Sequence, residues 1–322
     1  MKIPLLALLG LALASGAAAA PDGYNIAVVP KGTTNVYWKS IHAGALAAAR
    51  ELIAAGVPVR IIWKGPLRED DREQQVQVVE NFMGRAVDGI VLAPLDSRAL
   101  VAPVEEAVSA HIPVVIIDSG LESKAPASFI ATDNREGGRI AARRLGGLLG
   151  ARGRVIMLRY AVGSASTEAR EQGFLEVMRD QFPGIDLLST DQHAGATRDT
   201  ARRVAENLLS RFGGEVTGIF ASNESATSGM LLALRDAGLA GGKVAFVGFD
   251  SSETLDAALK SGDIQGLVVQ NPFKMGYLGV QTIVAVLRGE KVPAMIDTGV
   301  GLATPENMNE PATNALLHPP TD

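Results

Sequence analysis

The sequence predicts an α/β protein made of two similar lobes, each a doubly wound parallel sheet, joined by a hinge that the chain crosses more than once. Three observations predict this fold. Short runs rich in Val and Ile alternate with longer Ala- and Leu-rich amphipathic stretches, as in βαβ units. This alternation starts a second time near the middle of the chain. The chain has 322 residues, 47% of them hydrophobic, which is enough for two domains with buried cores.

The first series of elements begins just after Asn25 with the run IAVV. Its apolar runs are nearly continuous, which is typical of parallel strands covered by helices on both faces. Strands are expected at 26–29, 59–63, 89–93 and 114–118, and helices between them at 40–55, 74–85 and 99–110.

The second series begins with the run RVIML and ends with KVAFVGFD. Its pattern is the same, so a second parallel sheet is expected. Strands are expected at 154–158, 186–190, 218–222 and 243–250, and helices from about 168, at 197–212 and at 225–237. A helix at 272–288 and a strand-like piece near 296–302 complete the chain and must return to the lobes.

Two internal correspondences indicate that the lobes are related. The stretches that begin GIVLAPLDS and GIFASNES each run strand, polar turn, helix and strand, and they end at Asp118 and Asp250. A nine-residue step also recurs, from Asn35 to Gly44 and from Ser164 to Gly173. We therefore expect a signal peptide at 1–20, an N-terminal lobe at 21–126 plus 271–299, and a C-terminal lobe at 127–270 plus 300–322. The hinge crossings are expected at about Ala127, Gln270 and Gly299.

The N-terminus has the features of a cleavable secretory signal. Lys2 precedes an apolar run that is too short to span a bilayer comfortably, and small residues follow at 17–20. We expect cleavage near Ala20 or Pro21; an uncleaved anchor or a buried helix is the alternative. The chain has no cysteine, which excludes disulfides and a lipid-modified cysteine anchor. No later stretch resembles a membrane span, so we expect a soluble protein of a bacterial periplasm.

Composition and motifs argue against several classes of function. The formal charge of -5 and the scattered basic residues give no electrostatic footprint for nucleic acid. The four His residues show no metal-ligand spacing. The glycines of EGGRIAARRLGG do not follow the dinucleotide-binding pattern, and Ser164 and Ser166 lie in no nucleophile elbow. We expect no cofactor, no metal and no catalysis.

In open α/β sheets, ligands bind beyond the carboxyl ends of the strands. The residues that follow the apolar runs here mix aromatic rings, carboxylates, amides and guanidiniums. A ring face packs on C–H surface, while the polar groups exchange hydrogen bonds with hydroxyls, so this set suits a polyhydroxylated molecule. Lys31 and Asp118 are candidates from their places at strand ends, although Asp118 could serve only in a turn.

Eight motifs, in order and at the expected spacing, carry a resemblance over essentially the whole chain after the leader: TTNVYWKSIHAGA, DGIVLAPLDS, IPVVIIDSG, IATDNREGG, STEAREQGF, IFASNES, FVGFDSS and VVQNPFKMGY. The sequence resembles the type I periplasmic substrate-binding proteins of ABC importers, in the ribose-binding-protein group. The resemblance implies a sugar-binding cleft between the lobes. It places ligand-binding roles on Asn35, Tyr37, Trp38, Asp96, Arg170, Asn223, Phe249, Asp250 and Gln270.

Simpler interpretations of these residues remain open. Tyr37 and Trp38 could be core residues at a helix start. Asp96 could be only a helix N-cap, with Ser97 as the competing cap. Arg170 could be a surface ion-pair residue.

The chain departs from the family pattern in ways that bear on the ligand. Ala196 stands where many sugar binders have an aromatic ring, so the second ring is absent or comes from elsewhere. Lys31 replaces a common small residue, and Val36 replaces the usual Pro. The cleft could be made basic by Lys31, Arg98, Arg159, Arg170 and Arg198. The ligand is then a sugar, a polyol, a sugar acid or another small molecule.

The resemblance implies a monomeric solute receptor that delivers its ligand to the permease subunits of an ABC importer, with a chemoreceptor as an alternative or additional partner. Two other classes are weighed against it. A sugar-responsive transcriptional regulator would need a helix-turn-helix domain where the signal peptide lies. An exported sugar-modifying enzyme would need two carboxylates facing one bond, and Asp96 and Asp250 are the candidates.

Overall fold

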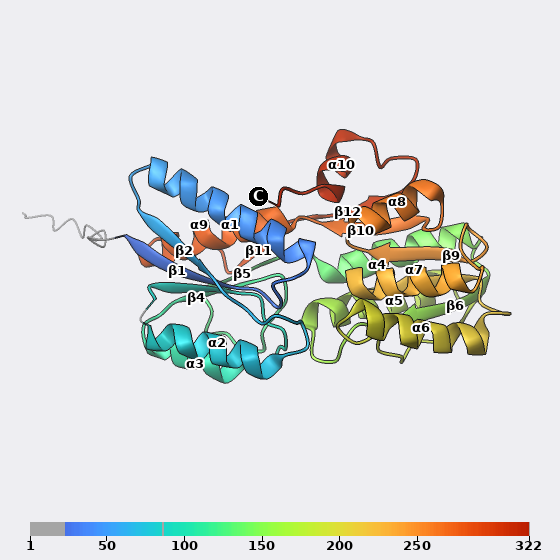
Figure 1. Cartoon of the computed structure of the whole chain (residues 1–322), viewed down its shortest axis with the longest axis horizontal. Coiled ribbons are helices and arrows are strands. Elements are labelled where there is room, and N and C mark those ends of the chain that lie inside the picture. The colour runs from blue at the N-terminus through green and yellow to red at the C-terminus, as the bar shows by residue number, and fades with distance from the viewer. Residues whose placement is uncertain (1–22, 86, 322) are drawn as a thin grey trace, which may run out of the picture.

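The computed structural model describes residues 23–85 and 87–321, so the predicted signal peptide lies outside the described residues. Two six-stranded sheets lie side by side, one in each lobe (Figure 1). The α/β class and the two-lobed arrangement predicted from the sequence are confirmed. None of the helices in the described part of the chain is long and apolar enough to cross a membrane.

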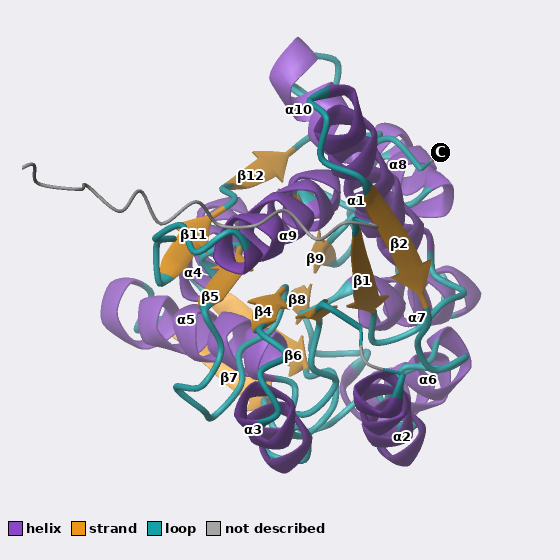
Figure 2. Ribbon diagram, turned by 90° about the vertical axis from the view of Figure 1, so that its left-hand side faces the viewer, coloured by secondary structure: helices purple, strands orange, loops and turns teal. Residues whose placement is uncertain are grey.

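The first sheet has the strand order β11-β5-β4-β3-β1-β2, and all of its pairings are parallel. Its strands are β1 (Tyr24–Val29), β2 (Val59–Trp63), β3 (Gly89–Leu92), β4 (Val114–Ile117), β5 (Ser128–Ala131) and β11 (Met295–Asp297). Its helices are α1 (Val36–Ala54), α2 (Arg72–Gly84), α3 (Val101–Ser109) and α9 (Pro272–Leu287). Helices α1 and α9 cover one face of the sheet, and α2 and α3 cover the other (Figure 2).

The second sheet repeats this plan in the order β12-β10-β9-β8-β6-β7. Its strands are β6 (Gly153–Leu158), β7 (Ile185–Ser189), β8 (Gly218–Ala221), β9 (Ala245–Phe249), β10 (Gly266–Gln270) and the antiparallel β12 (Val300–Ala303). Its helices are α4 (Asn134–Leu148), α5 (Ala165–Gln181), α6 (Arg198–Phe212), α7 (Glu224–Asp236), α8 (Glu253–Ser261) and α10 (Pro311–Leu317).

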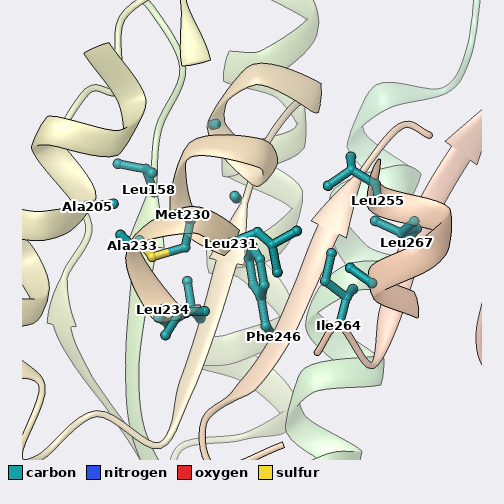
Figure 3. Close-up of a cluster of buried hydrophobic side chains, with 14 of the residues drawn as sticks. Leu158, Ala205, Met230, Leu231, Ala233, Leu234, Phe246, Leu255, Ile264 and Leu267 are labelled. Atoms are coloured by element: carbon teal, nitrogen blue, oxygen red, sulfur yellow. The ribbon is translucent and has the colours of Figure 1, made fainter. Parts of the chain in front are cut away.

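Both faces of the second sheet are buried under apolar side chains. Helices α4 and α5 pack on one face, and α6, α7, α8 and α10 pack on the other. Figure 3 shows part of the apolar cluster on the face covered by α6, α7, α8 and α10, where side chains of α7 gather beside Phe246 of β9. Burial of both faces explains why the strands read as nearly continuous apolar runs in the sequence.

Equivalent helix pairs cross closely in the two lobes. Gly44 of α1 lies where a Cβ atom would overlap the carbonyl oxygen of Phe273 in α9. Gly173 of α5 stands in the same relation to the carbonyl oxygen of Arg135 in α4. The internal repeat that ends at these two glycines is therefore confirmed, and its reason is the close approach of two helix backbones.

The chain changes lobe where β5 leads into α4, where β10 leads into α9, and where β11 leads into β12. The sequence placed the first crossing at about Ala127, and this position is corrected. Strand β5 pairs with β4 and β11 in the first sheet, so the change of lobe lies beyond Ala131. The run SFIA begins with the polar Ser128 and was not recognised as a strand.

Candidate functional site

A cavity of about 380 Å³, counted with its opening to solvent, lies between the lobes. Its walls come from strand ends and helix starts of both lobes. The lining residues are Lys31, Asn35, Tyr37, Trp38, Glu69 and Asp118 from the first lobe, and Tyr160, Ser164, Ser166, Thr167, Arg170, Asn223, Glu224, Asp250 and Gln270 from the second.

The two adjacent rings at the end of β1 are held by the start of helix α1. The Asn35 side chain caps the helix by accepting a hydrogen bond from the Tyr37 N–H at 3.0 Å. This cap sends both rings toward the lobe interface, where they pack edge to face with centroids 5.0 Å apart. Trp38 also donates from Nε1 to Glu69 Oε1 at 2.8 Å. The aromatic pair therefore forms one fixed wall of the cavity.

Lys31 and Asp118 form a buried ion pair beside these rings. Lys31 Nζ lies 2.9 Å from Asp118 Oδ2, and the Tyr37 hydroxyl donates to Asp118 Oδ1 at 2.7 Å. Burial, and then the charge of Asp118, raise the pKa of Tyr37 well above its ordinary value. The hydroxyl is therefore neutral at all ordinary pH values and remains a hydrogen-bond donor.

Arg170, Asp250 and Gln270 form the matching wall of the second lobe. The Arg170 guanidinium donates to Asn134 Oδ1 at 2.7 Å and lies 3.8 Å from Asp250 Oδ2. Gln270 Nε2 donates to Asp250 Oδ1 at 2.7 Å. Burial raises the pKa of Asp250, and the Arg170 charge opposes that shift. Gln270 Oε1 is buried, and no described residue donates a hydrogen bond to it.

Direct hydrogen bonds link the two lobes around the cavity. Asn35 Nδ2 donates to Glu224 Oε2 at 3.3 Å, and the Tyr160 hydroxyl donates to Glu69 Oε2 at 3.2 Å. Lys31 Nζ lies 3.4 Å from Ser166 Oγ. These contacts require the lobes to be close together, so the structure represents a closed arrangement.

Nine of the eleven residues predicted from the sequence line this one cavity: Lys31, Asn35, Tyr37, Trp38, Asp118, Arg170, Asn223, Asp250 and Gln270. Asp96 and Phe249 are the exceptions. Asp96 accepts hydrogen bonds from the backbone N–H groups of Arg98 and Ala99, both at 2.9 Å, so it caps the turn that leads into α3. The helix N-cap weighed against ligand binding is not observed for Asp96 or Ser97, because α3 begins at Val101 after Leu100 with no side-chain cap. Asp96 also pairs with Arg72, whose Nε lies 3.2 Å from Asp96 Oδ2.

Phe249 is fully buried and does not line the cavity. Its ring lies beneath the Arg170 guanidinium, with 3.7 Å from Cζ to the ring centroid. This is a cation–π geometry, which holds Arg170 in place. Phe249 is therefore a positioning residue for the cavity wall. The carboxylate pair Asp96 and Asp250, considered for catalysis, does not face one shared site.

The cavity also includes residues outside the eleven predicted ligand-binding positions: Glu69, Tyr160, Ser164, Ser166, Thr167 and Glu224. All of these except Glu69 follow predicted strands of the second lobe. Tyr160 lies two residues beyond the end of β6, so its strand-end position was a usable signal, and it supplies a ring from the second lobe. Glu69 lies in the charged stretch REDDRE, which is typical of a solvated loop and gave no signal. Burial raises the pKa of Glu69, and the hydrogen bond from Trp38 opposes that shift.

The expectation of a basic cleft is wrong. The cavity wall carries two cations, Lys31 and Arg170, and four carboxylates, Glu69, Asp118, Glu224 and Asp250. The other basic side chains that were proposed to face the cleft do not line the cavity, and they pair with carboxylates: Arg98 with Glu122, Arg159 with Glu171 and Arg198 with Glu224.

Within residues 23–85 and 87–321, no group of His, Asp and Glu side chains is arranged to hold a metal ion. The charged and polar side chains that line the cavity pair with one another, as Lys31 does with Asp118, and they leave acceptors such as Gln270 Oε1 available to a ligand. Such a site holds a small polar molecule by hydrogen bonds and ring contacts.

Two α/β lobes with repeated crossings and a polar cavity between them define a bilobal solute-binding protein. The family model described as a periplasmic binding protein domain matches residues 26–291, and the chain belongs to this family. The ribose import binding protein of Haemophilus influenzae is 32% identical over 90% of this chain and 93% of its own length. The D-ribose/D-allose-binding protein of Pseudomonas aeruginosa is 28% identical over 91% of this chain and 93% of its own.

Solved structures are similar over almost the whole fold. A carbohydrate transporter solute binding protein from Agrobacterium radiobacter, in complex with D-arabinose, is 36% identical with a TM-score of 0.86, and the match covers 93% of this chain and all of that chain. An ABC transporter solute binding protein from Agrobacterium vitis, with bound D-fucose, is 34% identical with a TM-score of 0.86, over 91% of this chain and all of that one.

Proposed function

We propose that this protein is a periplasmic receptor that binds a neutral monosaccharide or polyol between its lobes and delivers it to an ABC importer. The observation that carries the proposal is the composition of the cavity wall. Both lobes contribute rings, and both contribute carboxylates that are already held by cations or amides. Such groups receive hydroxyl protons while the rings pack on C–H surface.

The relatives support the same ligand class. Those named above are a ribose import binding protein, a ribose and allose binder, and structures with D-arabinose and D-fucose. All of these ligands are monosaccharides without a formal charge. The names of these relatives as import or transporter proteins support the ABC importer as the partner.

The charge of the cavity favours a neutral ligand over a sugar acid. Lys31 and Arg170 already face Asp118 and Asp250, so neither cation is free to meet an added carboxylate. A ligand carboxylate would also lie near Glu69 and Glu224. Like charges in a partly desolvated site raise the free energy of the bound state.

Gln270 Oε1 adds a specific expectation for the bound state. A buried acceptor without a donor costs about 1–3 kcal/mol, which a ligand hydroxyl would recover. Micromolar binding requires only about -8 kcal/mol in total. A few such hydrogen bonds and one ring contact supply this after the cost of ordering the hinge is subtracted.

Closure of the lobes is a population shift between an open and a closed form. A ligand biases that equilibrium only through contacts that both lobes make in the closed form. Tyr37 and Asp118 stand on one lobe, and Arg170 and Asp250 on the other, so a sugar between them meets this condition. The closed form then presents both lobes together to the permease.

Further parts of the proposal come from the sequence. We propose a leader cleaved near Ala20, a monomeric mature protein and no enzymatic activity, with a chemoreceptor as a second partner. The mass of the protein recovered from a periplasmic fraction tests the cleavage. Incubation with the bound sugar, followed by a search for any product, tests the absence of catalysis.

Binding is tested with a thermal-shift screen of D-ribose, D-allose, D-arabinose, D-fucose, xylitol and D-glucuronate, followed by isothermal titration calorimetry. A specific ligand raises the melting temperature by an amount that grows with the logarithm of its concentration over Kd. We expect one or more of the neutral compounds to bind and D-glucuronate not to bind. Tight binding of D-glucuronate alone, or of none of the compounds, would contradict the proposal.

A further inference from the structure

One side chain, Glu69, is shared by the cavity and by two outer grooves. The first groove has a volume of about 1,410 Å³ and the second about 870 Å³, each counted with its opening to solvent. The first runs between the loop at 68–73 and the second-lobe residues Tyr160, Ala161 and Val162. The second runs between the turn at 34–36 and the start of α6. Glu69 therefore stands where three spaces meet.

The walls between the cavity and the grooves are pairs of bonded side chains, one from each lobe. Tyr160 lines both the cavity and the first groove, and its hydroxyl donates to Glu69. Asn35 and Glu224 line both the cavity and the second groove, and they bond to each other. Closing the lobes thus seals the cavity on both sides of Glu69.

A hydrogen bond from Trp38 holds the Glu69 carboxylate in place, and a small side chain, that of Ala196, lies near Glu69 on the groove side. Trp38 Nε1 fixes one carboxylate oxygen at 2.8 Å. Ala196 lines both grooves near Glu69, and it offers only a methyl group. A larger side chain at position 196 would have narrowed the space outside the cavity. Here the outward limit of the cavity depends on the length of the Glu69 side chain.

We infer that Glu69 is a specificity-determining residue that restricts the ligand to a single unsubstituted monosaccharide. This inference rests on the proposed function, because it assumes that the cavity holds a sugar. Shortening the side chain joins the cavity to the grooves, so that a substituent on the sugar can extend into them. The length of the side chain, rather than its charge, sets this limit.

The test compares each free sugar with its two methyl glycosides by isothermal titration calorimetry. The sugar is whichever of D-ribose, D-allose, D-arabinose and D-fucose binds most tightly. Glu69→Ala removes the wall, and Glu69→Asp shortens it while keeping the charge. Glu69→Gln keeps the length and removes the charge. Arg68→Ala is the matched control, because Arg68 lines both grooves but not the cavity.

We expect the wild-type protein to bind the better methyl glycoside about 100-fold more weakly than the free sugar, within the range that steric discrimination reaches. Glu69→Ala should narrow this ratio to about tenfold or less, and Glu69→Asp should fall between the two. Glu69→Gln and Arg68→Ala should keep the wild-type ratio. If Glu69→Ala does not fold, Glu69→Asp carries the test.

Three results would overturn the inference. One is a wild-type protein that binds the methyl glycoside as tightly as the free sugar. The others are shortened Glu69 variants that keep the wild-type ratio of the glycoside Kd to the free-sugar Kd, and an Arg68→Ala variant that lowers this ratio as much as Glu69→Ala does. A wild-type protein that binds none of the four sugars would instead overturn the proposed function. The two failures are therefore distinguishable.

Discussion

Asp118 and Asp250 occupy equivalent positions in the two lobes. Each follows the end of a strand with a left-handed backbone, at φ 65° and 66°. Each donates its backbone N–H to the next strand, to Ile130 and to Val268 respectively. Each then turns its carboxylate toward a cation of its own lobe, Lys31 or Arg170. Since Asp tolerates the left-handed region better than most residues, one local geometry serves twice, once on each side of the cavity.

Replacing Asp250 by Asn should weaken sugar binding while preserving the fold. Asn also tolerates the left-handed conformation, so the backbone is not strained. The charge opposite Arg170 is lost, and the amide can no longer accept from Gln270 and the ligand in the same way. We expect an affinity loss of about tenfold or more, which is about 1.4 kcal/mol, by calorimetry.

Asp180→Asn is the matched control for this variant. Asp180 is exposed, and among the described residues its partner is the neighbouring Arg179. Its replacement should leave the affinity unchanged. Equal affinities for wild type, Asp250→Asn and the control would remove Asp250 from the site.

The fold was predictable because its strands are buried on both faces, and strongly apolar strands are easy to recognise. The strands 26–29 and 59–63 of the sequence prediction overlap β1 and β2 closely. Strand β5 was missed, and the first crossing was misplaced as a result. Its four residues contain a polar Ser128, whose hydroxyl donates to the Pro293 carbonyl, a contact with a distant segment.

The site was predictable only as far as strand ends specify it. Asp96 and Asp118 both follow apolar strands, and nothing local distinguishes them. They differ in their partners and in where they lie: Asp96 accepts from two backbone N–H groups and pairs with Arg72, whereas Asp118 pairs with Lys31 and lines the cavity. The basic cleft was mispredicted for a similar reason, because the pairing of Arg198 with Glu224 depends on tertiary structure.

Phe249→Leu should lower affinity although Phe249 does not line the cavity. The substitution removes the ring beneath the Arg170 guanidinium and with it a cation–π contact worth about 0.5–2 kcal/mol. Arg170 then loses its fixed orientation toward the cavity. We expect a several-fold to about tenfold rise in Kd by calorimetry.

Phe246→Leu separates this effect from a general loss of packing. Phe246 lies on the same strand and is equally buried, but it packs in the cluster of Figure 3 on the other face of the sheet. Both variants should lose stability by about 0.5–3 kcal/mol. Only Phe249→Leu should change affinity. Equal changes in Kd for the two variants would argue against a positioning role.

Asp256 gives the protein a pH-dependent term in its stability. Burial raises the pKa of Asp256 to about 6, and the nearby His318 opposes that shift. One carboxylate oxygen is buried without a hydrogen-bond partner among the described residues. The folded protein therefore holds this proton more tightly than the unfolded chain does. The stabilising contribution is complete below about pH 4 and is lost as the pH rises through about 6.

Asp256→Asn should remove this dependence. At pH 4 the variant and the wild type should have similar free energies of unfolding. Above pH 6 the variant should be more stable, by up to about 3 kcal/mol for a shift of about two pKa units. Urea unfolding at pH 4, 5, 6 and 7 measures the difference. A gap that is constant with pH, or that grows toward acid, would contradict this assignment.

Gly163 and Asp96 meet across the lobe interface. Ser97 N–H donates to the Gly163 carbonyl at 2.9 Å, and Arg72 donates to the neighbouring Val162 carbonyl at 2.9 Å. Gly163 has φ 90°, and a Cβ atom on it would overlap Asp96 Oδ2. The loop after β6 can therefore dock on the first lobe only because this residue has no side chain.

Gly163→Ala should oppose closure without touching the ligand, because Gly163 does not line the cavity. Apparent affinity falls in proportion to the fraction of molecules that can close, so we expect Kd to rise about tenfold or more for every sugar alike. Gly56→Ala is the control, since Gly56 shares the positive φ but has open space around it. Calorimetry with two sugars measures both Kd values, and small-angle scattering with saturating sugar measures compaction. An unchanged Kd, or a change in the ratio between the two sugars, would show that this contact does not control closure.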